Sequence, residues 1–355
     1  MSEKVLIKGN EAIGEAAIRA GCRYYFGYPI TPQSELPEFM AKKLPKIGGV
    51  FLQAESEIAA INMVYGAASA GVRAMTSSSS PGFSLKQEGI SYIAAAELPC
   101  LVVNVQRGGP GLGTIQPGQA DYFQATKGGG HGDYRLLVFA PNSVQELFDL
   151  TLQGFDLADQ YRTPVLILAD GALGQMMEAI SMERQPASPI DKPWAITGRR
   201  GRKETNLINT LFFDTDKAEQ HNIALQKKYA EISKNEVRSE EFFTEDADLV
   251  LVAYGITARI AKSAMEMARS QGLKVGLFRP ITLWPFPSDA LLKVAQTAKE
   301  FLVVELSSGQ MIEDVKLATQ CSKPVHFYGR TGGNIPEAEE VCQEIVKIMN
   351  AKGGL

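Results

Sequence analysis

Two glutamates, Glu55 and Glu57, stand at the head of the otherwise small and apolar segment QAESEIAAINMVYGAASAG. On a helix, residues two apart point in different directions, so the two acids cannot share one task. Counting in helical steps aligns Glu57 with the apolar residues Ala60, Ile61, Val64 and Ala68. Glu57 is therefore either a first-turn acid that faces water, as the helix dipole favours, or a buried carboxylate, which requires a partner in the protein or in a ligand.

A single arginine, Arg107, ends an apolar run and opens the glycine-rich stretch at residues 108–130. An arginine at this position suits a bidentate grip on a carboxylate, and an ordinary surface salt bridge is equally open. Lys127 and His131 follow within TKGGGHGD, where so many glycines require special backbone geometry or motion. Long loops of this kind can be lids over a site, although most are only turns.

Two further stretches offer hydroxyl groups. In GYPITPQSE, Thr31 before a proline is typical of a helix cap, and the alternative is a ligand position at the carboxyl end of a strand. Four serines at residues 77–80 precede Pro-Gly and offer hydroxyls and backbone N–H groups at a helix N-terminus. They could equally form a tight turn, and no G-x-S-x-G nucleophile motif is present.

The elements that must position these residues follow from the apolar pattern. Short apolar runs predict strands at 24–29, 72–78, 100–106, 135–141 and 164–170. Segments with helical periodicity lie among them, at 9–21, 33–43, 55–70, 83–96 and 143–161. Because the apolar runs lack polar alternation, we expect an α/β fold whose parallel sheet is covered on both faces.

The pattern predicts two α/β domains and a connector. The first domain spans residues 1–185, and residues 186–245 form an extended linker, rich in Pro, Gly and charge, that ends in a charged connector helix. The α/β rhythm then resumes in a smaller domain at residues 246–355. Its expected elements are strands at 247–255, 274–280, 301–307 and 325–330 and helices at 257–271 and 288–299.

Composition excludes several classes of protein. The chain has 355 residues and a net charge of -4, which disfavours nucleic-acid binding. No apolar run approaches the roughly 18 residues that span a bilayer, and the N-terminus lacks the apolar core of a signal peptide, so we expect a cytoplasmic protein. The four cysteines are scattered and form no C-x-x-C, so we expect no metal site in this chain alone.

Several segments together resemble the α subunit of 2-oxoacid:ferredoxin oxidoreductases, which are thiamine-diphosphate enzymes. The segments are GNEAIGEAAIRAGCRYYFGYPITPQSE, QAESEIAAINMVYGAASAG, TSSSSPGFSLKQEGISYIAAAELPCLVVNVQRGGPGLGT, QADYFQATKGGGHGDYR and RPITLWPFP. The resemblance spans nearly the whole chain and is nearest to the branched-chain (3-methyl-2-oxobutanoate) type, with the 2-oxoglutarate type next. It implies a pyrimidine-type thiamine-diphosphate-binding domain followed by a domain like the C-terminal domain of transketolase. It also implies oxidative decarboxylation of a 2-oxoacid to an acyl-CoA, with electrons passed to ferredoxin.

The resemblance assigns roles to individual residues. Glu57 corresponds to the glutamate that hydrogen-bonds N1′ of the cofactor's aminopyrimidine and favours the tautomer that removes the C2 proton, a form of general acid–base help. Thr31 corresponds to a threonine near the substrate, and Arg107 to the arginine that holds the substrate carboxylate. The resemblance places four more residues against the cofactor: Tyr28, Pro29, Ile30 and Ser80.

Substrate choice stays open at the level of the sequence. Lys127 or His131 could bind the second carboxylate of 2-oxoglutarate, and we include both among the substrate-binding candidates. Tyr28 and Leu112 could instead form the apolar wall that a branched-chain substrate needs.

An absent motif predicts a shared active site. Thiamine enzymes hold the diphosphate through Mg²⁺ with a G-D-G motif followed by an asparagine, and the nearest stretches here are HGDY and ADGA. We therefore expect a β subunit to supply the diphosphate half of the site, Mg²⁺ and, by resemblance, an iron–sulfur cluster. Typical companions in the family are a γ subunit and a ferredoxin-like δ subunit, with coenzyme A as co-substrate.

Two other classes of function remain as alternatives. The chain could be a non-catalytic scaffold subunit in which Glu57 and Arg107 are vestigial. It could also be a free-standing dinucleotide-binding dehydrogenase, against which the missing G-x-G-x-x-G between a strand and a helix argues.

Overall fold

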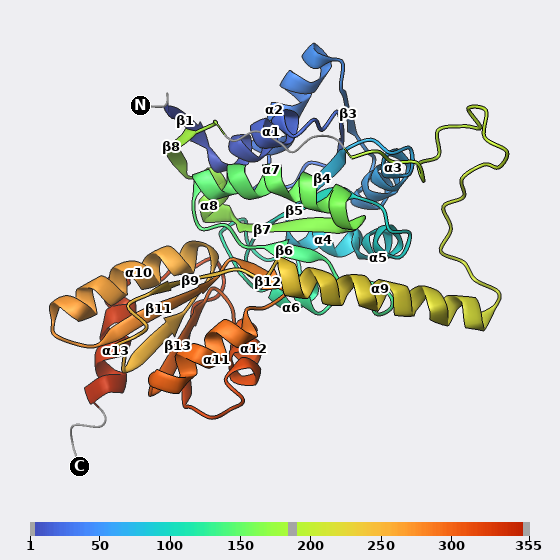
Figure 1. The fold of residues 1–355 in the computed structure, drawn as a ribbon. Helices are drawn as coiled ribbons and strands as arrows, with labels where there is room; N and C mark the ends of the chain where they lie inside the picture. The colour runs from blue at the N-terminus through green and yellow to red at the C-terminus, as the bar shows by residue number, and fades with distance from the viewer. Residues whose placement is uncertain (1–3, 184–189, 351–355) are drawn as a thin grey trace.

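The structure is a computed structural model that describes residues 4–183 and 190–350, and it contains two large sheets (Figure 1). The first has seven strands in the order β12-β6-β7-β5-β4-β2-β3, all parallel except β12. Its strands are β2 (Tyr24–Gly27), β3 (Val50–Gln53), β4 (Ala74–Ser78), β5 (Cys100–Gln106), β6 (Leu137–Phe139), β7 (Pro164–Asp170) and β12 (Thr282–Trp284). The five strands predicted here are confirmed: β5 and β7 have the predicted bounds, and β2, β4 and β6 are shorter than predicted.

Helices cover both faces of this sheet, as the unbroken apolar runs require. One face carries α1 (Gly9–Arg19), α2 (Glu35–Lys43) and α7 (Val144–Tyr161). The other carries α3 (Glu57–Ser69), α4 (Ser80–Leu85) and α5 (Gln87–Ala95) (Figure 1). The single helix predicted over 83–96 is thus two helices, which meet at Lys86.

Five strands are absent from the sequence prediction. One of them, Ser239–Phe242, falls within the predicted connector and joins the second sheet. The other four are missed for physical reasons. The edge strand β3 has a largely exposed pattern, so it gives no apolar signal. The three-residue strand β12 lies far along the chain and pairs with β6 only after the second unit folds back. The strands β1 (Lys4–Lys8) and β8 (Met177–Ser181) form a separate antiparallel pair, in which most side chains are at least partly exposed.

The connector is as extended as its composition predicts. Residues 190–214 contain no helix or strand and run away from the body of the chain before α9 (Thr215–Asn235) returns to it (Figure 1). The charged helix buries only Leu225, Tyr229 and Ile232. Residues 184–189 of the predicted linker lie outside the described residues.

The second sheet has five strands in the order β14-β13-β10-β11-β9. Its strands are β9 (Ser239–Phe242), β10 (Leu249–Val252), β11 (Val275–Pro280), β13 (Glu300–Glu305) and β14 (Val325–Gly329). One face carries α10 (Gly255–Ser270) and α13 (Ala338–Asn350), and the other α11 (Ser288–Thr297) and α12 (Met311–Ala318) (Figure 1). Shorter helices are η1 (Leu44–Ile47), α6 (Tyr122–Thr126) and α8 (Gly171–Gln175). In the described part of the chain, no helix combines the length and hydropathy that a membrane crossing requires.

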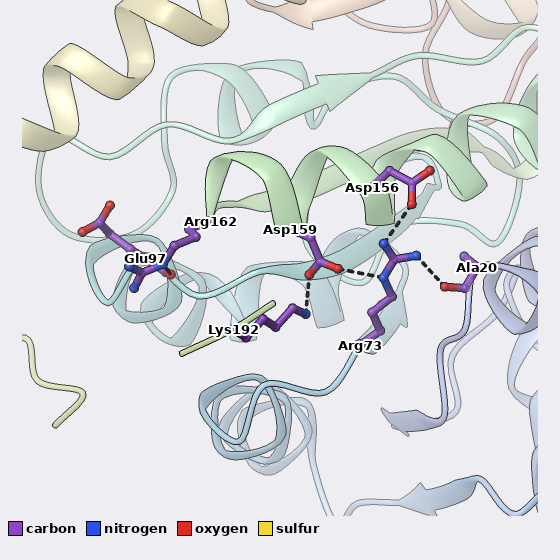
Figure 2. Close-up of polar contacts among 7 residues, drawn as sticks. All are labelled: Ala20, Arg73, Glu97, Asp156, Asp159, Arg162 and Lys192. Atoms are coloured by element: carbon purple, nitrogen blue, oxygen red, sulfur yellow. Dashed lines mark hydrogen bonds and ion pairs between the residues drawn. The ribbon is translucent and has the colours of Figure 1, made fainter. Parts of the chain in front are cut away.

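A cluster of ion pairs closes the amino-terminal edge of the seven-stranded sheet (Figure 2). We call it the Arg73 cluster; its members are Arg73, Asp156, Asp159 and Lys192. Arg73, just before β4, donates to Asp159 and to Asp156 at 2.8 Å each and to the backbone oxygen of Ala20 at 2.6 Å. Lys192 pairs with the second oxygen of Asp159, which ties the connector to α7.

Candidate active site

The residues singled out in the sequence gather at the opposite, carboxyl-terminal edge of the seven-stranded sheet. Parallel strands end at the same edge, and ligands of open α/β sheets bind there. Thr31 follows β2, Glu57 follows β3, Ser80 follows β4 and Arg107 follows β5. The topology therefore brings together positions that are up to 76 residues apart, as the hydrogen bond between Arg107 and Thr31 shows.

Glu57 is the first residue of α3 and is only 6% exposed. The helix begins there because the hydroxyl of Ser56 accepts a hydrogen bond from the backbone N–H of Ala59 at 3.2 Å. The predicted apolar stripe of Ala60, Ile61, Val64 and Ala68 is buried with it. Glu55 precedes the N-cap and is exposed, whereas the first-turn acid Glu57 is buried, so of the two alternatives for Glu57 the buried carboxylate is the one observed.

The Glu57 carboxylate lies directly against the backbone of α4. A Cβ atom at Gly82 would lie 2.3 Å from Oε1 of Glu57 and 2.3 Å from Oγ of Ser78, so only glycine fits this position. The hydroxyl of Ser78 is buried and has no hydrogen-bond partner among the described residues. The Glu57 carboxylate, the Ser78 hydroxyl and the Gly82 backbone are therefore packed together between α3, β4 and α4.

Lys86 lines the same region, although the sequence analysis did not single it out. It is fully buried at the junction of α4 and α5, and its ammonium has no hydrogen-bond partner in the described part of the chain. Burial lowers the pKa of Lys86 to about 8, and the negative charge of Glu57 opposes that shift. We call Glu57, Ser78, Gly82 and Lys86 the Glu57 pocket.

Arg107 is held by neutral groups alone. Its Nη1 donates to the backbone oxygen of Thr31 at 3.0 Å and its Nη2 to the backbone oxygen of Leu112 at 2.9 Å. The side chain is 7% exposed, and Nε is buried without a partner. Within residues 4–183 and 190–350 no carboxylate forms an ion pair with Arg107. A buried cation without a counter-ion is costly unless an anion joins it.

Arg107 and Ser80 line a cavity of about 470 Å³ between the two α/β units. From the first unit its walls are also formed by the glycine-rich residues 108–111 and by Asp121. The second unit contributes residues 306–308 and Gln310. Such a concave, mostly preformed junction is a common setting for small-molecule sites.

Inside this cavity the hydroxyl of Ser80 is already engaged. It donates to Oδ2 of Asp121 at 2.6 Å and accepts from the backbone N–H of Arg107 at 3.0 Å. The same carboxylate oxygen accepts from Asn104 at 2.8 Å, and burial raises the pKa of Asp121. Asp121 is a second residue that the sequence reading missed, because a lone acid in a glycine-rich loop carries no periodic signal.

Thr31 does not cap a helix. The helix α2 begins at Glu35 after Ser34, so the interpretation of Thr31 as an N-cap is wrong. The chain makes a turn at residues 31–32 first, which leaves Thr31 exposed beside a separate cavity of about 510 Å³. Its neighbours Tyr28 and Pro29 are exposed and Ile30 is partly buried, all on the same surface.

Lys127 and His131 do not reach the Arg107 cavity. The ammonium of Lys127 pairs with Asp314 of α12 and lines a third cavity, with Trp284 and Phe286. His131 is exposed in a glycine-rich turn. The hydroxyl of Tyr134 holds that turn by accepting the backbone N–H groups of residues 129 and 130, at 3.2 and 2.9 Å.

The two units are joined by residues at the rim of the cavity. The side chain of Gln119 donates to the backbone oxygen of Tyr254 at 2.9 Å and accepts from the backbone N–H of Leu306 at 3.0 Å. Asp170 of the ADGA stretch accepts three backbone N–H groups, from Ala172, Leu173 and Ile256, at 3.0 to 3.1 Å. Its carboxylate is therefore occupied by capping α8 and holding the start of α10.

Family comparisons agree with this architecture. Residues 15–243 match the thiamine diphosphate-binding domain of the pyruvate flavodoxin/ferredoxin oxidoreductase family. Residues 247–341 match core domain II of pyruvate:ferredoxin oxidoreductase. A split-gene transketolase, described as an inactive β4 tetramer, matches with a TM-score of 0.60 at 15% identity over 96% of this chain and 97% of its own. The predicted combination of a thiamine-diphosphate-binding fold and a transketolase-like domain is confirmed.

Comparison with individual relatives narrows the assignment of the chain within this family. The chain is 54% identical to the ketoisovalerate oxidoreductase subunit VorB of Methanothermobacter marburgensis, over 97% of both chains. It is 37% identical to the 2-oxoglutarate synthase subunit KorA of Methanothermobacter thermautotrophicus, over 98% of this chain and all of that one. A 2-oxoglutarate:ferredoxin oxidoreductase from Magnetococcus marinus, solved with 2-oxoglutarate, coenzyme A and succinyl-CoA bound, matches with a TM-score of 0.87 at 28% identity, over 98% of this chain and 65% of its own. The chain therefore belongs to the 2-oxoacid:ferredoxin oxidoreductase family, as one of its subunits.

Proposed function

We propose that this chain is the α subunit of a thiamine-diphosphate-dependent oxidoreductase that decarboxylates a branched-chain 2-oxoacid to an acyl-CoA and passes the electrons to ferredoxin. The observation that carries the proposal is Arg107, a buried guanidinium with an unpartnered Nε and only carbonyl acceptors, at the wall of a cavity. A 2-oxoacid brings a carboxylate, which is the planar anion that an arginine binds best. Thr31 lies next to this cation and would help to orient the substrate.

The Glu57 pocket fits the pyrimidine half of the cofactor. Glu57 is a buried carboxylate at the start of a helix, in a region that also holds unpartnered hydroxyl and ammonium groups. Hydrogen bonds from such groups to a polar ring offset the cost of taking that ring out of water. Glu57 would hold the aminopyrimidine, with Tyr28, Pro29, Ile30 and Ser80 nearby. When bound, thiamine diphosphate supplies the nucleophilic carbon and the electron sink for decarboxylation. Glu57 itself holds a hydrogen bond, and thereby a proton position, at the ring nitrogen.

The diphosphate half of the site belongs to a partner in this proposal. Asp170 is occupied by three backbone N–H groups and Asp133 of HGDY is exposed, so neither suits a Mg²⁺–diphosphate site. In the described part of the chain, no three His, Cys, Asp or Glu residues are grouped to hold a metal ion. We therefore assign Mg²⁺ and the iron–sulfur cluster to a β subunit, with γ and ferredoxin-like δ subunits as further partners and coenzyme A as co-substrate.

A branched-chain substrate is favoured over 2-oxoglutarate. Identity to the ketoisovalerate subunit exceeds that to the 2-oxoglutarate subunit, at 54% against 37%. The loop that Arg107 holds presents apolar side chains, with Leu112 82% and Ile115 56% exposed. Lys127, the candidate for a second carboxylate, already pairs with Asp314. The 2-oxoglutarate alternative would require Lys127 to leave that carboxylate or His131 to move.

The scaffold alternative makes a different prediction. A vestigial site should lose its unpaired charges, because nothing would offset the cost of burying them. Both Arg107 Nε and Lys86 Nζ are nevertheless buried without partners in the described part of the chain. Full activity of a complex that carries Glu57→Gln would favour the scaffold.

Reconstitution with a panel of substrates tests the proposal. The chain is purified alone and with its co-purifying partners, and methyl viologen reduction is followed with several 2-oxoacids plus coenzyme A. We expect turnover only when the β partner is present, and a higher kcat/KM for 3-methyl-2-oxobutanoate than for 2-oxoglutarate. Turnover by the isolated chain would contradict the shared site, and a preference for 2-oxoglutarate would contradict the substrate assignment.

A further inference from the structure

Lys86 is a buried cation on the helix pair that packs against Glu57, a buried carboxylate of the candidate site. It lies where α4 ends and α5 begins, and α3 packs against both helices. Positions 82, 83, 89 and 90 around it are buried, so its side chain emerges on the inner face of the helix pair. No other element offers a hydrogen-bond acceptor to its ammonium in the part of the chain that the structure describes.

A buried carboxylate such as Glu57 needs positive charge around it. The N-terminus of α3 supplies a partial charge of roughly half a unit. Placing an ionised carboxylate in a medium of low polarity costs several kcal/mol unless a full counter-charge is near. Lys86 stands one helical turn after Gly82, whose backbone lies against the Glu57 carboxylate, so its side chain emerges on the face of the helix pair that carries Glu57. The negative charge of Glu57 accordingly opposes the lowering of the Lys86 pKa by burial. Gly82 keeps the space beside the carboxylate free of side-chain atoms.

We propose that Lys86 is a positioning residue whose buried ammonium supplies the counter-charge that holds the Glu57 carboxylate in place for the cofactor ring. The proposal rests on the proposed function for what Glu57 does, but the charge coupling itself exists in the chain without any ligand. Lys86 does not touch the reacting atoms. It acts through Glu57, and the unpartnered hydroxyl of Ser78 lies beside the same glycine, Gly82, as the Glu57 carboxylate.

A double-mutant cycle on the full chain tests the coupling without any activity assay. Lys86→Met leaves the Glu57 carboxylate without its counter-charge, Glu57→Gln leaves the ammonium alone, and the double variant removes both charges. We expect the double variant to be more stable than either single variant, with a coupling of about tenfold in the unfolding equilibrium constant. Additive effects would overturn the proposal. If Lys86→Met alone does not fold, normal folding of the double variant supports the coupling, and failure of both overturns it.

A pH profile of the assembled complex tests the consequence for Glu57. Lys86→Met removes a positive charge from beside the candidate site, so the acid limb of the kcat/KM profile should move about one pH unit upward. The matched control is Lys228→Met, because Lys228 is also a largely buried lysine with a lowered pKa, paired at 3.0 Å with Glu97 far from the site. That variant should leave the acid limb unmoved.

The two experiments separate this inference from the proposed function. In one case, the cycle shows coupling while the complex neither binds thiamine diphosphate nor turns over 2-oxoacids. That result would support the Lys86–Glu57 charge pair and refute the proposed function. In the opposite case, turnover depends on Glu57 but the acid limb of the kcat/KM profile does not move in Lys86→Met. That result would support the proposed function and overturn the role of Lys86.

Discussion

The two edges of the seven-stranded sheet bury charge in opposite ways. At the amino-terminal edge, the Arg73 cluster pairs both of its cations with carboxylates, and Arg73 also reaches a backbone oxygen (Figure 2). At the carboxyl-terminal edge, Lys86 Nζ, Ser78 Oγ and Arg107 Nε are buried without partners in the described part of the chain. We interpret the fully paired Arg73 cluster as structural and the incompletely paired cations Lys86 and Arg107 as groups prepared for a ligand.

The difference follows from the architecture. Loops at the carboxyl ends of parallel strands can vary without disturbing the sheet, and ligands bind there. The fold must compensate for the buried, unsatisfied groups that such a site contains, because they lower its stability. The Arg73 cluster joins α1, β4, α7 and the connector, which makes it one source of that compensation.

The largest expected effect is on catalysis, at the carboxyl-terminal edge. Glu57→Gln should lower turnover of the assembled complex by about 10²–10⁴-fold, because an amide cannot take part in the proton transfer that a carboxylate supports. The matched control is Glu55→Gln, two residues away, exposed and outside the pocket. Equal activity of the two variants in the viologen assay would contradict the role of Glu57.

The next largest effect is on folding, at the amino-terminal edge. Arg73→Met removes one partner of a buried network, in which the Arg73 and Asp159 side chains are 11% and 4% exposed. We expect a loss of about 3 kcal/mol in the free energy of unfolding, measured by denaturant titration. Arg269→Met, which breaks the more exposed pair with Asp246, should cost about 1 kcal/mol or less. Activity per folded complex should be normal for both, and an Arg73→Met complex that folds normally but is inactive would contradict the division between the two edges.

A smaller effect is expected at Arg107, where a substitution by lysine distinguishes the role of the positive charge from that of the planar guanidinium. Arg107→Lys keeps the positive charge and loses the planar fork, so it should raise KM for the 2-oxoacid by about 10–100-fold. The measurement is steady-state kinetics of the assembled complex, with the KM for coenzyme A as the internal control. An unchanged KM for the 2-oxoacid would mean that Arg107 does not hold the substrate carboxylate.

The smallest effect is expected at Lys127. Its ammonium pairs with Asp314 and its side chain is 47% exposed, so Lys127→Ala should cost about 1 kcal/mol of stability or less. Turnover of the branched-chain 2-oxoacid should stay within about threefold of the unmodified complex. A selective loss of 2-oxoglutarate turnover would show instead that Lys127 reaches a second carboxylate.

The sequence predicted those parts of the fold that depend on local burial. Strands β4, β5 and β7 are buried at every position and mostly apolar or small, so their runs were visible. The inward position of Glu57 was visible in the same way, as a charge on an apolar stripe. Lys86 is likewise a charged residue aligned with apolar positions within 82–90, so the same count of helical positions would have identified it.

Other features depend on contacts that no local pattern contains. β12 pairs with β6 across more than a hundred residues of sequence, and Lys127 meets Asp314 from the other unit. Thr31 has the local sequence of a helix cap, but the chain turns once more before α2 begins at Glu35. Tertiary structure decides each of these positions, which is why propensity and spacing alone missed them.

A structure of the chain assembled with its β subunit and thiamine diphosphate tests the role of Glu57 most directly. We expect the aminopyrimidine to lie against Glu57, with one carboxylate oxygen within hydrogen-bond distance of N1′ and the side chain fully shielded from solvent. A ring bound elsewhere, or a Glu57 carboxylate surrounded by water in that complex, would contradict this role.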